Sequence, residues 1–157
     1  MKTLLLVFHP EPEKSVRNKM LVSKISEKSN VTVHWVDNSI FTASPEKLKE
    51  EEKLLYSGFQ QIVFQFPLYW YTIPACCKYY MDYVMINGYS KLAGIHIRTV
   101  ITTGASDAYY ESRNCPERLL GFMEITAELC GMKMEKSVMV NTDHEAKSVA
   151  EYIKIFE

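Results

Sequence analysis

The strongest constraint on the fold comes from short apolar runs in which polar residues do not alternate with apolar ones. The first run, Lys2–Phe8, contains three consecutive leucines and is followed directly by His9 and Pro10. A strand with apolar side chains on both faces is typical of a parallel sheet that is covered by helices on either side. The sequence therefore predicts a protein of the α/β class.

Predicted strands and helices alternate along the rest of the chain. The predicted strands are Lys2–Phe8, Val31–Val36, Gln61–Phe66, Ile97–Thr102 and Lys133–Val140. The predicted helices run from the N-cap Ser15 to near Asn30, from the N-cap Ser44 and Pro45 through Leu55, from Ala75 to about Ile86, from Pro116 to Leu129 and from Ala146 to Phe156. This alternation predicts one domain, residues 1–157, with a five-stranded parallel sheet of order 2-1-3-4-5 between two layers of helices.

Composition excludes several classes of protein. Lys and Arg number 18 and Asp and Glu number 19, so the chain lacks the positive charge that nucleic-acid binding requires. Its apolar runs are far shorter than the roughly 20 residues of a membrane-spanning helix. The stretch Leu4–Phe8 is also too short for a secretory signal. We therefore expect a cytoplasmic protein that binds no nucleic acid and does not insert into a membrane.

The four cysteines indicate no metal site. Cys76, Cys77, Cys115 and Cys130 form neither a CxxC motif nor a Cys/His pattern with the spacing of zinc ligands. We interpret them as small apolar residues on helices in a reducing compartment. The alternative is a redox-sensing role for an exposed Cys115 or Cys77.

The predicted strand order places three loops at one ligand-binding edge. In such sheets ligands bind at the carboxyl ends of the strands, close to the point where the strand order reverses. The loop after the first strand contains His9 and Ser15. The Ser15 hydroxyl and the free amides of the following helical turn would form an anion site. An ordinary capped loop is the alternative, since the glycine-rich patterns of nucleotide-binding loops are missing.

Three consecutive aromatic residues, Tyr69, Trp70 and Tyr71, follow the third strand and lie between Pro67 and Pro74. Aromatic side chains in a surface loop are costly to expose, and the prolines restrict the loop. Such a loop requires a flat ligand, another subunit or the core of the protein itself as its partner.

The loop after the fourth strand contains Thr102, Thr103 and Gly104, which suit a backbone that closely approaches a polar ring edge. A plain turn is the alternative. Taken together, the three loops would supply an anion site, an aromatic platform and a hydrogen-bonding edge. A planar heteroaromatic ligand that carries a phosphate fits this combination, and flavin mononucleotide (FMN) is the most economical candidate.

The segment 62–75, IVFQFPLYWYTIPA, is followed by Lys78 and Asp82. On this segment the chain resembles the flavodoxin-like NAD(P)H:quinone oxidoreductases, which include the DT-diaphorase type and the ancillary proteins of glutathione-gated potassium efflux systems. The pair His9-Pro10, the turn at residues 102–104 with Tyr109, and the segment 126–132 (TAELCGM) add to the resemblance, which covers about residues 3–140.

The resemblance implies a flavodoxin-like three-layer sandwich that binds FMN and uses NADPH or NADH as electron donor. Hydride would pass through flavin N5 to a quinone or a related two-electron acceptor, and the protein would be a homodimer. Implied flavin-binding residues are His9, Ser15, Val16, Arg17 and Asn18 around the phosphate, Pro67, Leu68, Tyr69, Trp70 and Tyr71 along the ring and ribityl chain, and Thr102, Thr103 and Gly104 at the pyrimidine edge. Tyr109 is the implied catalytic residue at the reactive face.

The chain departs from this family at three places. The segment Gly88–Gly94 is short, Ala105 follows Gly104 where the family has a second glycine, and Cys115 stands where the DT-diaphorase branch has a histidine. Because of Cys115, assistance of the tyrosine by a histidine is not implied for this chain. The short segment and Ala105 favour an alternative function: a regulatory or binding subunit with reduced or lost catalysis, for example one that docks to a membrane transporter of a potassium efflux system. The short chain after residue 140 favours FMN over FAD.

Overall fold

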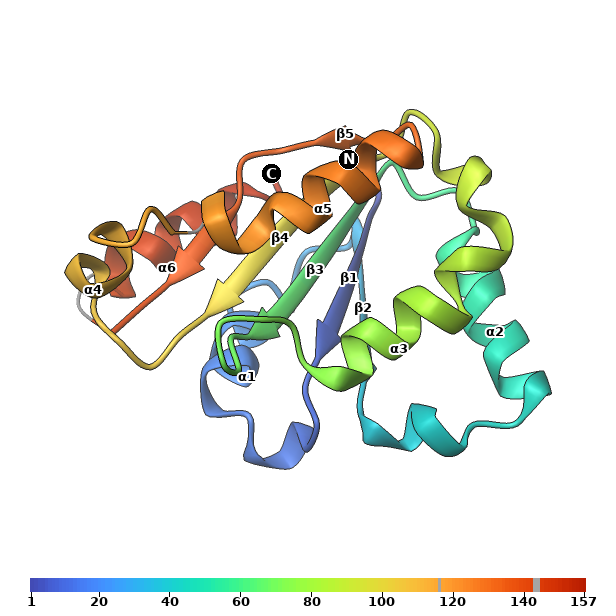
Figure 1. Cartoon of the computed structure of the whole chain (residues 1–157), viewed down its shortest axis with the longest axis horizontal. Helices are drawn as coiled ribbons and strands as arrows, with labels where there is room; N and C mark the ends of the chain where they lie inside the picture. Colours follow the sequence, from blue (N-terminus) through green and yellow to red (C-terminus); the bar gives the residue numbers. More distant parts are fainter. Residues whose placement is uncertain (116, 143–144) are drawn as a thin grey trace.

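The molecule is built around a parallel β-sheet (Figure 1). The computed structural model describes residues 1–115, 117–142 and 145–157. The strand order is β2-β1-β3-β4-β5, and β6 pairs with β4 on the same edge as β5. The strands are β1 (Thr3–Phe8), β2 (Val31–Val36), β3 (Gln61–Pro67), β4 (His96–Thr102), β5 (Lys133–Met134) and β6 (Val138–Val140). The predicted class and strand order are confirmed.

Helices cover both faces of this sheet. The α-helices are α1 (Val16–Ser23), α2 (Pro45–Leu55), α3 (Ala75–Tyr83), α4 (Asp107–Glu111), α5 (Glu117–Leu129) and α6 (Glu145–Lys154). Short 3₁₀ helices are η1 (Pro12–Lys14), η2 (Asn38–Thr42) and η3 (Met85–Leu92). Buried residues of α1 and α6 pack on one face, and those of α2, α3 and α5 pack on the other.

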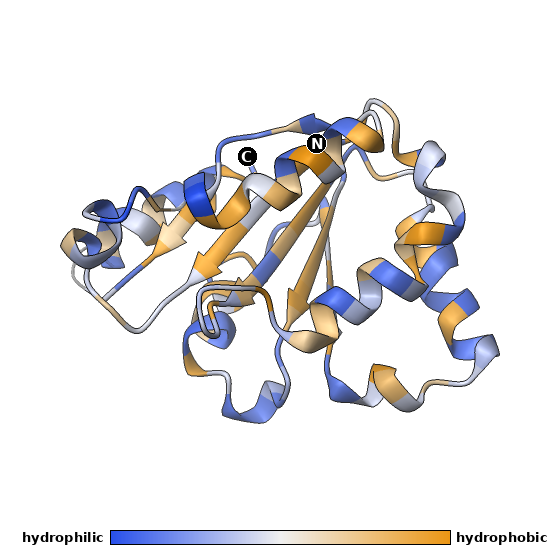
Figure 2. Ribbon diagram, viewed as in Figure 1, coloured by the Kyte–Doolittle hydropathy of each residue, from blue (hydrophilic) through white to orange (hydrophobic). Residues whose placement is uncertain are grey.

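Strand β1 shows why the sheet must have two covered faces. Successive side chains of a strand point to opposite faces. Leu4 and Leu6 belong to the core under α3 and α5, whereas Leu5 and Val7 belong to the core under α1 and α6. All four side chains are fully buried, and each contributes about 1.5–3 kcal/mol relative to exposure. The central strands are correspondingly hydrophobic along most of their length (Figure 2).

The predicted fifth strand is wrong in one respect, because residues 135–137 interrupt it between β5 and β6. Side chains of β4 bind this interruption. His96 Nδ1 lies 2.6 Å from a Glu135 carboxylate oxygen, and Arg98 donates a hydrogen bond of 2.5 Å to the carbonyl of Lys136. These side-chain bonds replace the regular ladder, and the apolar pattern of the segment does not reveal them.

Helix ends differ from the predictions where tight turns intervene. The first helix ends at Ser23 instead of near Asn30, since Lys24 and Ile25 form hydrogen bonds to carbonyls three residues earlier. Helix α3 ends at Tyr83, and the chain continues as η3. Helix α6 occupies Glu145–Lys154 instead of Ala146–Phe156, and the predicted start of α5 at Pro116 lies outside the described residues.

The short segment near residues 88–94 is mostly the 3₁₀ helix η3, which is kinked at Gly88. A Cβ at Gly88 would lie 2.9 Å from the ring of Tyr56, and the Tyr56 hydroxyl donates a hydrogen bond of 2.6 Å to the carbonyl of Met85. The glycine is thus required by the packing of this tyrosine.

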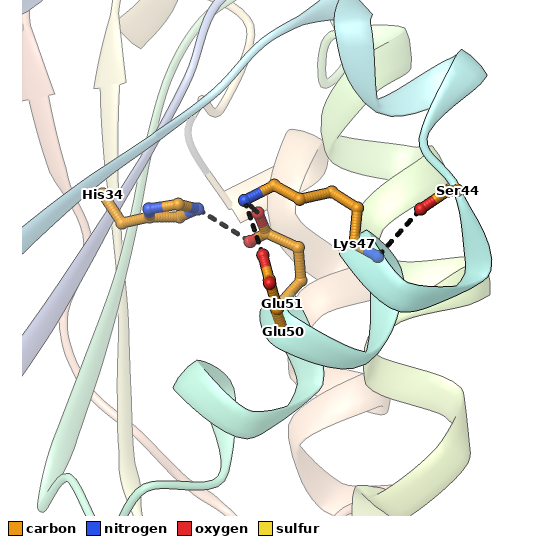
Figure 3. Close-up of polar contacts among 5 residues, drawn as sticks. All are labelled: His34, Ser44, Lys47, Glu50 and Glu51. Atoms are coloured by element: carbon orange, nitrogen blue, oxygen red, sulfur yellow. Dashed lines mark hydrogen bonds and ion pairs between the residues drawn. The ribbon is translucent and has the colours of Figure 1, made fainter.

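Helix α2 is fixed to the edge strand β2 by a polar network (Figure 3). The Ser44 hydroxyl accepts a hydrogen bond of 3.2 Å from the amide of Lys47, which confirms the predicted N-cap. The buried Glu51 carboxylate lies 2.7 Å from His34 Nε2 and 3.7 Å from Lys47 Nζ. A charged helix is thereby held over the sheet margin, with Leu55 in the core.

Three of the four cysteines are buried, in agreement with their interpretation as small apolar residues. Burial raises the pKa of the Cys76 thiol to about 11 and raises the pKa of Cys77 well above its usual value. The suggestion of an exposed, redox-sensing Cys77 is therefore wrong, while Cys115 is partly exposed. Among the described helices, none combines the length and the apolar character needed to cross a membrane.

Candidate functional site

A cavity of about 470 Å³ lies at the carboxyl ends of β1, β3 and β4, where the strand order reverses. This volume falls within the range of about 300–1,000 Å³ that is usual for small-molecule sites. Its walls consist of His9, Lys14, Ser15, Val16, Arg17, Asn18, Met20, Pro67, Leu68, Tyr69, Thr102, Thr103, Gly104 and Glu145.

One end of this cavity is formed by the first turn of α1. Ser15 occupies the N-cap position, but its hydroxyl accepts no backbone hydrogen bond and instead accepts one of 3.1 Å from Asn18 Nδ2. The amides of Val16, Arg17 and Asn18 consequently have no hydrogen-bond acceptor within the part of the chain that the structure describes. Free amides at a helix N-terminus provide a binding site for an anion.

The charges around this end are mixed but mainly positive. Lys14 and Arg17 line the cavity beside the amides, and Glu145 contributes the one carboxylate among the lining residues given above. The Arg17 guanidinium donates a hydrogen bond to the carbonyl of Thr103, which ties α1 to the end of β4. Sequence reasoning missed both Lys14 and Glu145 as lining residues. Glu145 is distant from the three loops in the sequence, and only the fold brings it to this edge.

His9 is placed to act as a neutral hydrogen-bond donor. Its Nδ1 accepts a hydrogen bond of 3.1 Å from the amide of Glu11, so the proton of the neutral ring is on Nε2. The Tyr69 hydroxyl lies 3.3 Å from Nε2. Burial lowers the pKa of His9, although the nearby Glu11 opposes this effect.

The three-aromatic loop after β3 is a two-residue hairpin. Tyr69 and Thr72 exchange backbone hydrogen bonds of 3.1 and 3.0 Å, and Trp70 and Tyr71 between them have positive φ values of 49° and 61°. Positive φ at both central positions defines a type I′ turn, which favours Asn and Gly over aromatic residues. The Trp70 side chain is 94% exposed. Strain of this kind is retained mainly at functional sites.

A second cavity of about 320 Å³ adjoins the first and shares Leu68 and Gly104 with it. Its remaining lining residues are Trp70, Tyr71, Ala105, Tyr109 and Tyr110. The hydroxyls of Tyr71 and Tyr109 form a hydrogen bond across it, which joins the loops after β3 and β4. This bond to Tyr109 is the main cause of a raised pKa at Tyr71.

Arg113 lies in the turn after α4 and supports Tyr109 of that helix. Its guanidinium lies 3.8 Å from the centroid of the Tyr109 ring and donates a hydrogen bond of 2.7 Å to the Tyr109 carbonyl. A cation over an aromatic ring stabilises that ring's position. The short helix α4 was not predicted, since its five residues carry no apolar period.

All of the residues implied by the sequence as flavin-binding or catalytic line one of these two cavities. The shape of the site also fits a flat cofactor with a phosphate. Free amides and cationic side chains lie at one end, aromatic rings lie at the other, and Gly104 lies between them. A Cβ built on Gly104 would meet no atom within 4 Å, so open space lies in front of this glycine.

Known proteins resemble the chain over most of its length. It is 25% identical to a solved NADPH-quinone reductase from P. pentosaceus, with a TM-score of 0.86, covering all of this chain and 98% of that one. It is 39% identical over 144 residues to the glutathione-regulated potassium-efflux system ancillary protein KefG of Pectobacterium carotovorum, covering 83% of this chain and 76% of that protein. The family described as "Flavodoxin-like fold" matches residues 1–156.

The chain belongs to the flavodoxin-like NAD(P)H:quinone oxidoreductase family. Another structure of the same fold is the general stress protein 14 from Treponema denticola, solved in complex with FMN. That protein is 24% identical, has a TM-score of 0.83, and matches 99% of this chain and 98% of its own. At this identity the likeness demonstrates the shared fold.

Proposed function

We propose that this protein is an FMN-dependent oxidoreductase that transfers electrons from NADPH or NADH to a quinone or a related two-electron acceptor. The observation that carries the proposal is the pair of adjoining cavities at the carboxyl edge of the sheet, one rich in hydrogen-bond donors and the other aromatic. Bound FMN supplies hydride transfer between donor and acceptor. The solved NADPH-quinone reductase and the FMN-containing structure of the same fold support this assignment.

The donor-rich cavity would hold the flavin phosphate. Among the described residues, the first-turn amides of α1 and the Ser15 hydroxyl have no acceptor and so provide donors, and Lys14 and Arg17 provide positive charge. His9 would add its Nε2 hydrogen. On the far side of Gly104, Leu68 and the backbone of the aromatic turn would support the ring. Thr103 would meet its polar edge, whereas Thr102 shares the Asn18 side-chain amide with Ser15 and would lie at the phosphate end.

The aromatic cavity would receive the nicotinamide and the acceptor in turn. Trp70 and Tyr71 offer apolar rings to a flat substrate, and Tyr109 offers a hydroxyl at the same face. We assign Tyr109 the role of hydrogen-bond donor to the acceptor oxygen, where negative charge develops on reduction. The adjacent Tyr71 hydroxyl and the Arg113 guanidinium hold this phenol in place.

Two measurements on purified protein test the proposal. The first is the binding of FMN, followed by flavin fluorescence and by the absorbance of the purified protein. The second is the oxidation of NADPH and NADH with a small quinone. We expect stoichiometric FMN and turnover faster than that of free FMN. A protein that binds no FMN would exclude the proposed function.

A second candidate function is supported by the curated relative named as an ancillary protein of a potassium efflux system. In this alternative the flavin is a structural or sensing ligand, and the protein docks to a membrane transporter. Ala105, which takes the place of a second glycine beside the predicted ring site, favours reduced catalysis. Tight FMN binding without quinone turnover above that of free FMN would favour this alternative.

We also propose that the protein forms a homodimer through α3 and its neighbours. Tyr79 and Tyr83 stack on the outer side of α3 with ring centroids 4.2 Å apart, and Phe41 contacts Tyr79 edge-on. Tyr83 is 52% exposed, so a large aromatic surface faces solvent in the single chain. Light scattering should give the mass of a dimer, and Tyr83→Glu should lower it toward that of a single chain. An unchanged dimer in this variant would exclude α3 as the interface.

A further inference from the structure

Beneath the anion end of the cavity lies a chain of buried side-chain amides and hydroxyls. Gln65 of β3 is fully buried, and its Nε2 lies 3.1 Å from Asn18 Oδ1 and 3.5 Å from the Asn18 carbonyl. Asn18 is also buried, and its Nδ2 donates to Ser15 Oγ at 3.1 Å and to Thr102 Oγ1 at 3.3 Å. These hydrogen-bonded side chains thus connect the centre of the sheet to two hydroxyls, those of Ser15 and Thr102, whose residues line the cavity.

The orientation of the Gln65 amide determines the direction of every bond in this chain. The backbone carbonyl of Asn18 faces the end of Gln65 and can only accept a hydrogen bond, so the NH₂ group of Gln65 points toward it. Asn18 must then present its oxygen to Gln65 and its own NH₂ to the two hydroxyls. Gln65 Oε1, on the other side, has no partner among the described residues, so this orientation leaves one buried oxygen unpaired.

A hydroxyl that accepts from Asn18 retains its single hydrogen for another acceptor. Ser15 and Thr102 both accept from Asn18 Nδ2, and the described part of the chain gives neither hydroxyl an acceptor for its hydrogen. Reversal of the Asn18 amide would make Oδ1 the acceptor for both hydroxyls. Their hydrogens would then point into the protein, and the cavity would lose two donors.

We propose that Gln65 is a positioning residue that orients Ser15 and Thr102 as hydrogen-bond donors toward the phosphate of bound FMN. This inference rests on the proposed function, which it extends to a residue that lines neither cavity. Gln65 acts through Asn18 and contacts no part of the flavin. Its effect is therefore confined to ligands that carry the phosphate.

Gln61 provides a matched control within the same strand. It is fully buried, its Oε1 also has no partner among the described residues, and its Nε2 donates to Thr3 Oγ1 at 3.2 Å. It lies at the opposite end of β3, where the strand begins, and lines neither cavity. Gln61→Met and Gln65→Met therefore each remove one buried glutamine amide, and we expect similar effects on the free energy of unfolding.

The experiment compares FMN with riboflavin, which lacks the phosphate, in titrations followed by flavin fluorescence. We expect Gln65→Met to weaken FMN binding about tenfold or more, the loss associated with a hydrogen bond to a charged group, and to change riboflavin binding less than about twofold. Gln61→Met should leave both affinities within about twofold of the wild type. Gln65→Leu, which also removes the NH₂ group and adds no charge, should reproduce the selective loss and serves if the methionine variant does not fold.

A double-mutant cycle with Asn18→Ala separates positioning from general loosening. In the absence of Asn18 no side chain connects Gln65 to the hydroxyls of Ser15 and Thr102, so Gln65→Met should cause no further loss of FMN affinity. Equal losses for FMN and riboflavin, a loss for Gln61→Met as large as that for Gln65→Met, or additive losses in the cycle would each overturn the inference. A wild-type protein that binds riboflavin but gains nothing from the phosphate would also overturn it. A wild-type protein that binds neither flavin would overturn the proposed function and this inference together.

Discussion

Replacing Trp70 by asparagine should stabilise the protein while removing part of its function. Trp70 has left-handed backbone, which costs an L residue other than Asn or Gly about 1–2 kcal/mol. The variant Trp70→Asn introduces a residue that a central position of a type I′ turn favours, and it leaves the hydrogen bond between Tyr71 and Tyr109 in place. Trp70 gives up little burial because its side chain is 94% exposed.

The gain expected from this value is about 1–2 kcal/mol in the free energy of unfolding. For a chain of this length each kcal/mol raises Tm by about 2–4 °C, so the flavin-free variant should melt about 2–8 °C higher. Urea denaturation of flavin-free protein measures the gain, and an FMN titration measures the loss of aromatic cover. A variant that is no more stable than the wild type would refute the strain argument. Undiminished FMN binding and quinone turnover would refute the functional role of Trp70.

Three further predictions address single side chains. Ser15→Ala should weaken FMN binding by about 1.5–3 kcal/mol with little effect on riboflavin, because a donor to a charged group is lost; equal losses for both flavins would contradict this role. Tyr109→Phe should slow quinone reduction about 100-fold while FMN binding remains near that of the wild type, and an unchanged rate would exclude Tyr109 as the donor. The free energy of unfolding of His9→Gln should depend less on acid than that of the wild type. The pKa of His9 is lowered in the folded state, so the unfolded chain binds a proton that the folded protein does not. The stability of the wild type should therefore fall relative to that of the variant as pH decreases through 6.5. Urea denaturation at several pH values checks the last prediction, and a constant difference between the two proteins would contradict it.

The architecture was predictable because it depends on patterns that the sequence displays directly. A run such as Leu4–Phe8, buried on both faces, requires two covered faces, and Ser44 with Pro45 marks a helix start unambiguously. The interruption of the last strand was not predictable. It depends on hydrogen bonds from Arg98 and other side chains of β4, a strand more than thirty residues away in the chain.

The site was predictable in its residues but not in its internal contacts. The loops after β1, β3 and β4 meet at one edge because parallel strands end there together, so residues as distant as Ser15 and Gly104 line one cavity. The hydrogen bond between Tyr71 and Tyr109 depends on how two loops face each other. Gln65 reads as an ordinary residue of a buried strand, and only its distance from Asn18 reveals its contact with the site.

The hydroxyl of Ser15 illustrates how a local rule fails at a proposed ligand-binding position. A serine before a helix normally accepts a hydrogen bond from an amide of the first turn, as Ser44 does. Ser15 instead accepts from Asn18, which leaves the amides of α1 available to a ligand. The loss of a cap at this helix is thus accompanied by free amides at the proposed anion site.

The most direct test of the proposed function is the rate of NADPH and NADH oxidation by FMN-loaded protein in the presence of a small quinone, measured against the same concentration of free FMN. We expect the protein-bound flavin to turn over faster than free FMN and to yield the two-electron product, the hydroquinone. A rate no greater than that of free FMN would contradict the proposed oxidoreductase function and favour the ancillary role.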